Sequence, residues 1–195
     1  MAFSRGLAAI ARALPLASFL SFALGVAAPQ ALAQEKAVAP EKNPPGDIPD
    51  SQVFVTYASP LGFQLKVPEG WARKDRRDGA SFADKYGEIA VVVRQGPAPT
   101  LASVRAGEAA ELEASGRAVK ITGVSEVKLP AGPAVRIVYG ENSEANAVTG
   151  KQIRLESERY LIAHAGSVAS LTFSAPAGAD NADQWKLMSD SFGWK

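Results

Sequence analysis

Two periodicities organise the hydrophobic residues of this chain, one typical of strands and one of helices. A repeat of two predicts a strand where Phe63, Leu65 and Val67 share one face while Gln64 and Lys66 share the other. By this pattern and the turn residues between segments, strands are predicted at residues 52–57, 62–67, 80–84, 88–94, 119–129, 133–139, 151–163 and 166–174.

Two segments carry helical patterns instead. The first helix is predicted at residues 100–115, because Thr100 is a suitable N-cap and Gly116 follows as a stop signal. The second is predicted to begin after Asp180 or Asn181. Its apolar residues recur at i, i+3 and i+7 and form one face, made of Trp185, Met188 and Phe192.

The order of these elements predicts the fold class. Strands joined by short turns indicate an antiparallel sheet, and two helices inserted at separate points make the class α+β. Residues 88–94 are apolar on both faces, which is typical of a central strand covered on both sides. We therefore expect an antiparallel β-sheet with a helix packed on each side, and a core that buries Trp71, Trp185 and Phe192.

The N-terminal residues 1–33 have the features of a cleavable export signal. Arg5 and Arg12 precede an apolar stretch at residues 14–28, and Ala31-Leu32-Ala33 offers small residues for cleavage before Gln34. The apolar stretch is shorter than the roughly 20 residues of a membrane-spanning helix. We expect a mature protein that begins at Gln34 and is periplasmic or secreted, and the alternative is an uncleaved anchor.

Residues 34–50 differ in composition from the rest of the chain. They contain four prolines and no aromatic residue, so they bury too little apolar surface to offset the entropy cost of ordering. We expect a flexible Pro-rich linker here. Residues 51–195 then form a single domain, because their number is usual for one hydrophobic core.

Composition excludes several classes of function. The chain has no cysteine, so disulfides, thiol nucleophiles and thiolate metal sites are absent. Its 21 basic and 20 acidic residues nearly balance, and loss of Arg5 and Arg12 with the export signal leaves a net charge of −1. Nucleic-acid binding and polybasic attachment to a membrane therefore have no support.

Two segments resemble a known family. Ser59-Pro60-Leu61-Gly62-Phe63, followed by Pro68-Glu69-Gly70-Trp71, and the closing Ser191-Phe192-Gly193-Trp194 are similar to the PsbP-like superfamily. Its members include an extrinsic photosystem II subunit, a Ran-binding protein and exported bacterial proteins of unclear role. The likeness covers nearly all of residues 51–195 and implies an α/β/α sandwich. The matching residues form turns and core, so the resemblance implies no catalytic or ligand residue.

Patterns for catalysis and metal binding are weak. His164 is the one histidine of the chain, and Ala165 and Gly166 after it form a tight turn without a nucleophile motif. A single histidine without cysteine also lacks partners for a zinc or iron site. We expect no catalytic residue, no metal site and no cofactor, and hence a protein that is not an enzyme.

Three charged clusters have two interpretations each. The alternating residues Arg154, Glu156, Glu158 and Tyr160 are either a ligand-facing patch or, as we favour, part of a ladder of cross-strand ion pairs. The acidic residues of the first helix are either a cation or partner site or, as we favour, a solvated face; these are Glu108, Glu111 and Glu113. A basic loop after Trp71 is either a site for an anionic partner or, as we favour, solvated; it contains Arg73, Lys74, Arg76 and Arg77.

The polar segment Glu141–Gly150 is longer than a simple hairpin requires, and long polar loops often carry function. Arginine and tyrosine beyond it are residue types that anchor interfaces when they are desolvated. We therefore predict a binding site composed of Asn142, Ser143, Asn146, Thr149, Lys151, Arg154, Arg159 and Tyr160. A plain connection between strands is the alternative.

Two functions from different classes follow. The favoured hypothesis is an exported, non-catalytic accessory or binding protein of the bacterial cell envelope that binds another protein. The alternative is a periplasmic small-ligand receptor or hydrolase that uses an Arg/Glu/Tyr cleft. An exposed aromatic or apolar patch near Tyr160 or the polar segment would favour the first hypothesis. A deep pocket that holds Arg154, Glu156 and Glu158, with raised carboxylate pKa values, would favour the second.

Overall fold

The computed structural model describes residues 35–195. The first strands are β1 (Phe54–Ala58), β2 (Phe63–Pro68), β3 (Ala72–Arg76), β4 (Gly79–Ala83) and β5 (Glu88–Gln95). A helical layer follows, composed of α1 (Leu101–Val104), the π-helical turn η1 (Arg105–Ala109) and α2 (Ala110–Ala114). The remaining elements are β6 (Lys120–Leu129), β7 (Gly132–Asn142), β8 (Arg154–His164), β9 (Ser167–Pro176), α3 (Ala182–Ser191) and β10 (Gly193–Trp194).

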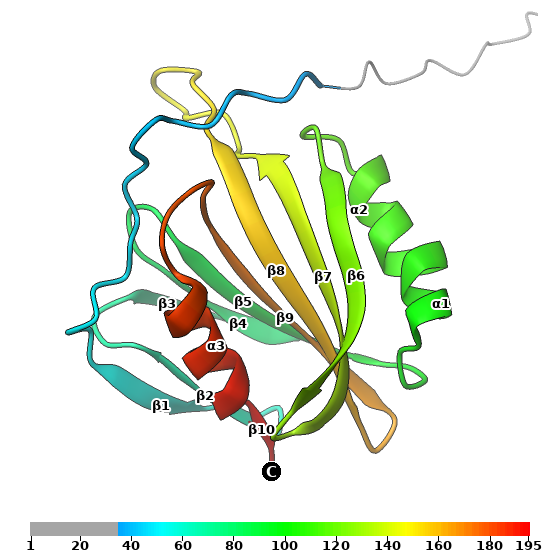
Figure 1. Cartoon of the computed structure of the whole chain (residues 1–195). Coiled ribbons are helices and arrows are strands. Elements are labelled where there is room, and N and C mark those ends of the chain that lie inside the picture. The colour runs from blue at the N-terminus through cyan, green and yellow to red at the C-terminus, as the bar shows by residue number, and fades with distance from the viewer. Residues whose placement is uncertain (1–34) are drawn as a thin grey trace, which may run out of the picture. The chain divides into compact units, whose positions relative to one another are not determined.

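The strands form two antiparallel sheets. The larger sheet has seven strands in the order β3-β4-β5-β9-β8-β7-β6, and the smaller has three in the order β1-β2-β10. Figure 1 shows α3 beside β2 and β10. The helical layer lies beside β6, the edge strand opposite β3 in the larger sheet. The predicted α+β class with antiparallel strands is confirmed. The first two predicted strands, however, form a sheet of their own with β10.

The larger core lies between the seven-stranded sheet and a layer composed of α3 and the small sheet. Phe63 of β2, Phe173 of β9 and Trp185 of α3 are buried there together with Phe192. The ring centroids of Phe63 and Phe192 lie 5.9 Å apart, and those of Phe173 and Trp185 lie 5.8 Å apart, both pairs stacked. The predicted burial of Trp185 and Phe192 is confirmed.

The predicted burial of Trp71 is wrong, because this side chain is only half-buried at the edge of the larger core. Trp71 follows β2 and precedes the exposed strand β3, so its ring packs over the turn between β4 and β5 rather than into the core. A Cβ added to Gly87 in that turn would lie 2.8 Å from the Cη2 atom of Trp71.

A smaller core lies on the opposite face of the seven-stranded sheet, under the helical layer. Val104 and Ala109 of the helical layer pack there against Ile137 and Leu161. The predicted N-cap is confirmed, because Oγ1 of Thr100 accepts a 3.1 Å hydrogen bond from the backbone of the third helical residue. The helices thus lie on opposite faces of the sheet, as the α/β/α prediction requires.

Two strands were not predicted, β3 and β10. Every residue of β3 is exposed, and its Ala-Arg-Lys-Asp-Arg sequence has no apolar alternation to reveal a strand. It forms by main-chain pairing with β4 at the edge of the sheet, where charged side chains discourage pairing with other molecules. The prediction of a basic loop at residues 73–77 is therefore wrong for all but Arg77, which lies in the β3–β4 turn.

Residues 35–50, predicted to be a flexible linker, contact two buried asparagines of the domain. Val38 donates a 2.9 Å hydrogen bond to Oδ1 of Asn142, and Ile48 donates one of 2.7 Å to Oδ1 of Asn181. Asn181 also donates through Nδ2 to the Gly46 carbonyl at 3.0 Å. In Figure 1 this segment passes the loop after β7 and then α3. Its flexibility in solution stays a prediction.

The predicted export signal and the cleavage site before Gln34 lie outside the described residues. From residue 35 onward, no helix combines the length and the apolar character that crossing a bilayer requires.

Replacement of Trp185 by alanine tests how α3 contributes to stability. We expect Trp185→Ala to lower the free energy of unfolding by about 3–5 kcal/mol, because it opens a cavity against Phe173. Leu187→Ala on the same helix is the control, since Leu187 is 40% exposed and its loss should cost less than about 1 kcal/mol. Urea denaturation of both variants measures the difference. Equal costs would mean that α3 does not dock on the core.

A second test concerns the close approach of β4 to β5. A Cβ on Gly79 would overlap the carbonyl oxygen of Val91 and lie 2.9 Å from its carbonyl carbon. We expect Gly79→Ala to destabilise the protein by about 1–3 kcal/mol or more, because the backbone of β5 must shift. Gly123→Ala is the matched control in another strand, where the nearest atom lies 4.0 Å away. Thermal unfolding that shifted equally for both variants would contradict this account.

Candidate functional site

β8 divides the predicted binding residues between the two faces of the seven-stranded sheet. Side chains alternate along a strand, so Tyr160 belongs to the larger core while Leu161 belongs to the core under the helical layer. Residues 154, 156 and 158 share the face of Tyr160, as the alternation predicted. Arg159 lies on the opposite face, so the structure does not bring Arg159 and Tyr160 into one site.

On the face toward α3, carboxylates and Tyr160 form a small polar group. Tyr160 donates a 2.5 Å hydrogen bond from its hydroxyl to Oε2 of Glu158, and Glu158 also pairs with Arg136 of β7 at 3.5 Å. The favoured interpretation as cross-strand ion pairs is thus confirmed for Glu158. Burial raises the pKa of Tyr160 to about 12, and the hydrogen bond to Glu158 adds to the rise.

Glu156 lies beside this group, with Glu158, at a cavity of about 190 Å³ that Asp180, Asn181 and Trp185 also line. Burial raises the pKa of Glu156. A hydrogen bond from the Gly178 backbone lowers this pKa, and the negative charge of Glu158 raises it. A carboxylate with a raised pKa is one feature expected of a receptor or hydrolase. Arg154, which that hypothesis also needs, does not line this cavity.

Asn142 and Arg154 instead support the turn after α2. Nη1 of Arg154 donates to Oδ1 of Asn142 at 3.1 Å and to the Ala118 carbonyl at 2.9 Å. The Asn142 backbone donates to the Arg117 carbonyl at 2.7 Å. Arg117 and Ala118 have φ angles of 51° and 48°, a conformation that costs energy for residues with a Cβ. These hydrogen bonds hold the turn in place.

The predicted polar loop is shorter than the sequence suggested, because Glu141 and Asn142 belong to β7 and are buried. The remaining loop residues bond to their own backbone. Oδ1 of Asn146 accepts hydrogen bonds from the amides of residues 148 and 149 at 3.0 and 2.9 Å. Oγ of Ser143 accepts from residue 153 at 3.0 Å, and Oγ1 of Thr149 accepts from Lys151 at 3.3 Å.

Val148 lies at the tip of this loop and is 93% exposed, more than any other large apolar residue described. Asn146 fixes the turn that presents it, since the Gly150 amide also donates to the Asn146 carbonyl at 2.8 Å. The structure therefore places an apolar side chain in solvent on an organised loop. Sequence reasoning selected the polar neighbours of Val148 and missed Val148 itself.

Functional groups also meet in a polar cleft of about 260 Å³. It lies on the same face of the seven-stranded sheet as the helical layer, next to that layer and over strands that the layer does not cover. Its floor consists of small residues of β5 and β9, namely Ala90, Val92, Ser170, Thr172 and Ser174. Its charged and larger lining residues are Arg76, Arg94, Arg117, Arg159, Glu88, Glu108, Glu141, Leu112 and Tyr139.

Two of the four arginines of the polar cleft are neutralised by glutamates. Arg159 pairs with Glu108, and its Nε donates to Oγ1 of Thr172 at 3.0 Å. Arg117 pairs with Glu141, which is only 5% exposed. The prediction that the acidic residues of the first helix are solvated is wrong for Glu108, because Glu108 pairs with Arg159 of β8.

Tyr139 and Ser174 line one side of the cleft, and Ser157 lies behind them. Oγ of Ser157 lies 2.8 Å from Oγ of Ser174 and 3.4 Å from Oε1 of Glu141. Burial raises the pKa of Tyr139, although the nearby Arg159 opposes the rise. The sequence held one signal of this cleft, because Ser170, Thr172 and Ser174 alternate with buried residues in β9 and so place hydroxyls on one face.

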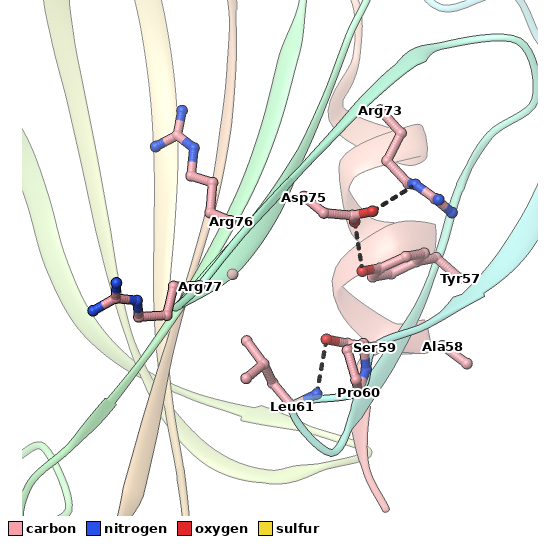
Figure 2. Close-up of a pocket in the computed structure, with 10 residues that line it drawn as sticks. Tyr57, Ala58, Ser59, Pro60, Leu61, Arg73, Asp75, Arg76 and Arg77 are labelled. Atoms are coloured by element: carbon pink, nitrogen blue, oxygen red, sulfur yellow. Dashed lines mark hydrogen bonds and ion pairs between the residues drawn. The ribbon is translucent and has the colours of Figure 1, made fainter.

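Another cavity, of about 290 Å³, lies between the turn after β1 and the edge strand β3 (Figure 2). Asp75 accepts a 3.1 Å hydrogen bond from the Tyr57 hydroxyl, and its other carboxylate oxygen lies 3.3 Å from Nε of Arg73. Arg73 and Asp75 are more than half exposed, so their ion pair contributes little to stability. Figure 2 shows Arg76 and Arg77 extending away from this pair.

His164 is exposed at the end of β8, and its ring stacks on Trp194 with centroids 5.9 Å apart. Within residues 35–195, no three side chains of histidine, cysteine, aspartate or glutamate are grouped closely enough to hold a metal ion. That His164 has no catalytic role stays a prediction.

The raised pKa of Glu156 gives a test of this half-buried carboxylate. A raised pKa favours the protonated form in the folded state, so stability is lost as the pH rises through that pKa. We therefore expect Glu156→Gln to increase the free energy of unfolding at pH 7, with a smaller gain at pH 4. Glu158→Gln is the control and should give no gain, because it weakens the contact with Arg136. Urea denaturation at both pH values measures this, and a loss at pH 7 for Glu156→Gln would contradict it.

Neither a family model nor a curated protein matches this chain, but solved structures do. Cyanobacterial PsbP (CyanoP) from Synechocystis sp. PCC 6803 is 14% identical with a TM-score of 0.52, covering 77% of this chain and 98% of its own. The Saccharomyces cerevisiae Ran-binding protein Mog1p is 11% identical with a TM-score of 0.51, covering 74% of this chain and 96% of its own. The structural similarity establishes a common fold, and identities this low establish no common activity. The chain has the PsbP-like fold that the motifs at residues 59–71 and 191–194 indicated.

Proposed function

We propose that this chain is an exported, non-catalytic accessory protein of the bacterial cell envelope that binds another protein through the loop at residues 143–151. The observation that carries the proposal is Val148, which is 93% exposed at the tip of this loop. An apolar side chain in that position gains free energy when a partner covers it.

The loop suits binding because its conformation is already fixed. The Asn146 amide donates a 2.9 Å hydrogen bond to the Lys151 carbonyl and closes the loop. Oδ1 of Asn146 accepts hydrogen bonds from the amides of Val148 and Thr149. A loop held in one conformation loses less entropy when it binds. The hydrogen bonds of Asn146 and Thr149 therefore support the contact that Val148 makes.

The predicted binding residues take different parts in this proposal. Ser143, Thr149 and Lys151 belong to the loop and supply polar groups beside the apolar side chain of Val148, as interfaces commonly have. Asn142 and Arg154 hold the base of the loop from β7 and β8. Arg159 and Tyr160 are engaged on opposite faces of the sheet and lie outside this contact.

A protein partner is supported by the nature of the fold as well as by the loop. Mog1p, which shares the fold, is described as a Ran-binding protein, so a domain of this shape serves protein binding elsewhere. An exposed aromatic or apolar patch near Tyr160 or the polar segment is the feature expected of the accessory protein, and Val148 supplies one exposed apolar side chain on that segment.

Capture of a partner from an envelope fraction tests the proposal. We expect immobilised wild-type protein, residues 34–195, to retain a specific partner, and Val148→Asp to reduce its retention about tenfold or more, as loss of an interface hot spot does. Val53→Asp is the matched control, because Val53 is 57% exposed elsewhere and its substitution should leave retention unchanged. Quantitative mass spectrometry of the retained proteins measures both.

A shortened loop gives a second measurement. Replacement of residues 147–150 by Asn-Gly preserves the Asn146–Lys151 backbone pair, so the variant should fold with a similar melting temperature. It should nevertheless lose the partner. Retention equal to that of wild type in both the shortened and the Val148→Asp variants would overturn the proposal.

A further inference from the structure

The polar cleft carries an inference that is independent of the loop, because its charges are unequally distributed. Arg117 and Arg159 are paired with Glu141 and Glu108. Arg76 and Arg94 line the same cleft, and neither takes part in an ion pair within residues 35–195.

The strand register places these two arginines at one end of the cleft. Arg76 of β3 is paired with Gly79 of β4, and Gly79 is paired with Val92 of β5, two residues before Arg94. Arg76 and Arg94 therefore flank the same patch of floor from strands about 10 Å apart, which is two strand spacings. Glu88 lies six residues before Arg94, roughly 20 Å along β5 and at the opposite end.

The floor between the two arginines is made of small side chains. Gly79 contributes none, and Val92 and Ser170 lie next to it in the register across β5 and β9. A group bound there meets no bulky side chain from these floor positions and lies between the strands that carry Arg76 and Arg94. Guanidinium groups bind carboxylates with two parallel hydrogen bonds, which makes this end of the cleft suited to a carboxylate.

The size and surroundings of the cleft favour a peptide over a free small molecule. Its volume of about 260 Å³ is below the roughly 300–1,000 Å³ of pockets that bury a drug-sized ligand. Lys74 lies on the same strand face as Arg76, and Arg77 follows in the adjacent turn, so positive charge continues outside the cleft along the sheet edge. An extended chain with several carboxylates matches this arrangement.

We propose that the cationic end of the polar cleft binds an acidic peptide segment of a protein, with one carboxylate between Arg76 and Arg94. Lys74 and Arg77 attract the flanking carboxylates along β3. Arg117 and Arg159 are neutralised by their glutamate partners and form the walls of the cleft. The negative charge of the ligand is bound by Arg76 and Arg94.

Fluorescence anisotropy with a fluorescein-labelled peptide of alternating glycine and glutamate tests this site. We expect saturable binding to the protein at residues 34–195, with no binding of the matching glycine–glutamine peptide. The double variant Arg76→Gln/Arg94→Gln should weaken binding about tenfold or more, because each lost contact involved a charged group. Both arginines are exposed, so the variant should keep the wild-type melting temperature.

Lys120→Gln/Lys128→Gln is the matched control, since it removes the same charge from exposed positions on β6, outside the cleft. It should bind the glutamate peptide as wild type does. Val148→Asp should also bind normally, which separates this site from the loop. Equal weakening in both double variants, or no saturable binding by wild type, would overturn the proposal. Succinate that competed at peptide-like concentrations would also overturn it, because the site would then be one for a free small anion.

Discussion

The seven-stranded sheet is covered on both faces by different layers, and this constraint governs where every functional group of the described chain can lie. Because side chains alternate along a strand, neighbouring residues of β8 enter different environments. Tyr160 packs with Phe173 on the side of α3, while Arg159 reaches Thr172 and Glu108 on the side of the helical layer. A shift of one residue in register would bury the wrong set on each side, so the two cores fix the register together.

The helical layer covers only part of its face, and the polar cleft exists for that reason. Its apolar residues pack on β6, β7 and β8 through Ile137 and Leu161. Beyond them, β5 and β9 present small and hydroxyl-bearing residues on this face while their other face carries Val91 and Leu171 into the larger core. The apolar face of each strand is held in the larger core, while its small and hydroxyl-bearing face stays exposed to water. The floor of the polar cleft is therefore rigid and still accessible.

Two buried asparagines, Asn142 at the end of β7 and Asn181 before α3, bond the domain to residues 35–50. Asn142 and Asn181 each use the side-chain amide to bond the backbone of residues 35–50, and both are almost fully buried. A buried amide without a partner costs about 1–3 kcal/mol, so this segment satisfies groups that the domain would otherwise leave unpaired. Asn142 also bonds Arg154, and through it supports the turn that holds Arg117 over the cleft.

The sequence by itself determined the elements with strong periodicity. The alternation of Phe63, Leu65 and Val67 and the apolar face of the last helix predicted strands and a docked helix, because burial of one face requires those patterns. The sequence did not reveal β3, since its pairing depends on main-chain hydrogen bonds that carry no side-chain pattern. Only the tertiary structure decided which charged residues meet: Glu108 and Arg159 lie 51 residues apart in the chain and form an ion pair across two elements. It likewise decided that Val148 is exposed, because exposure depends on how a turn projects and not on the residue that the turn carries.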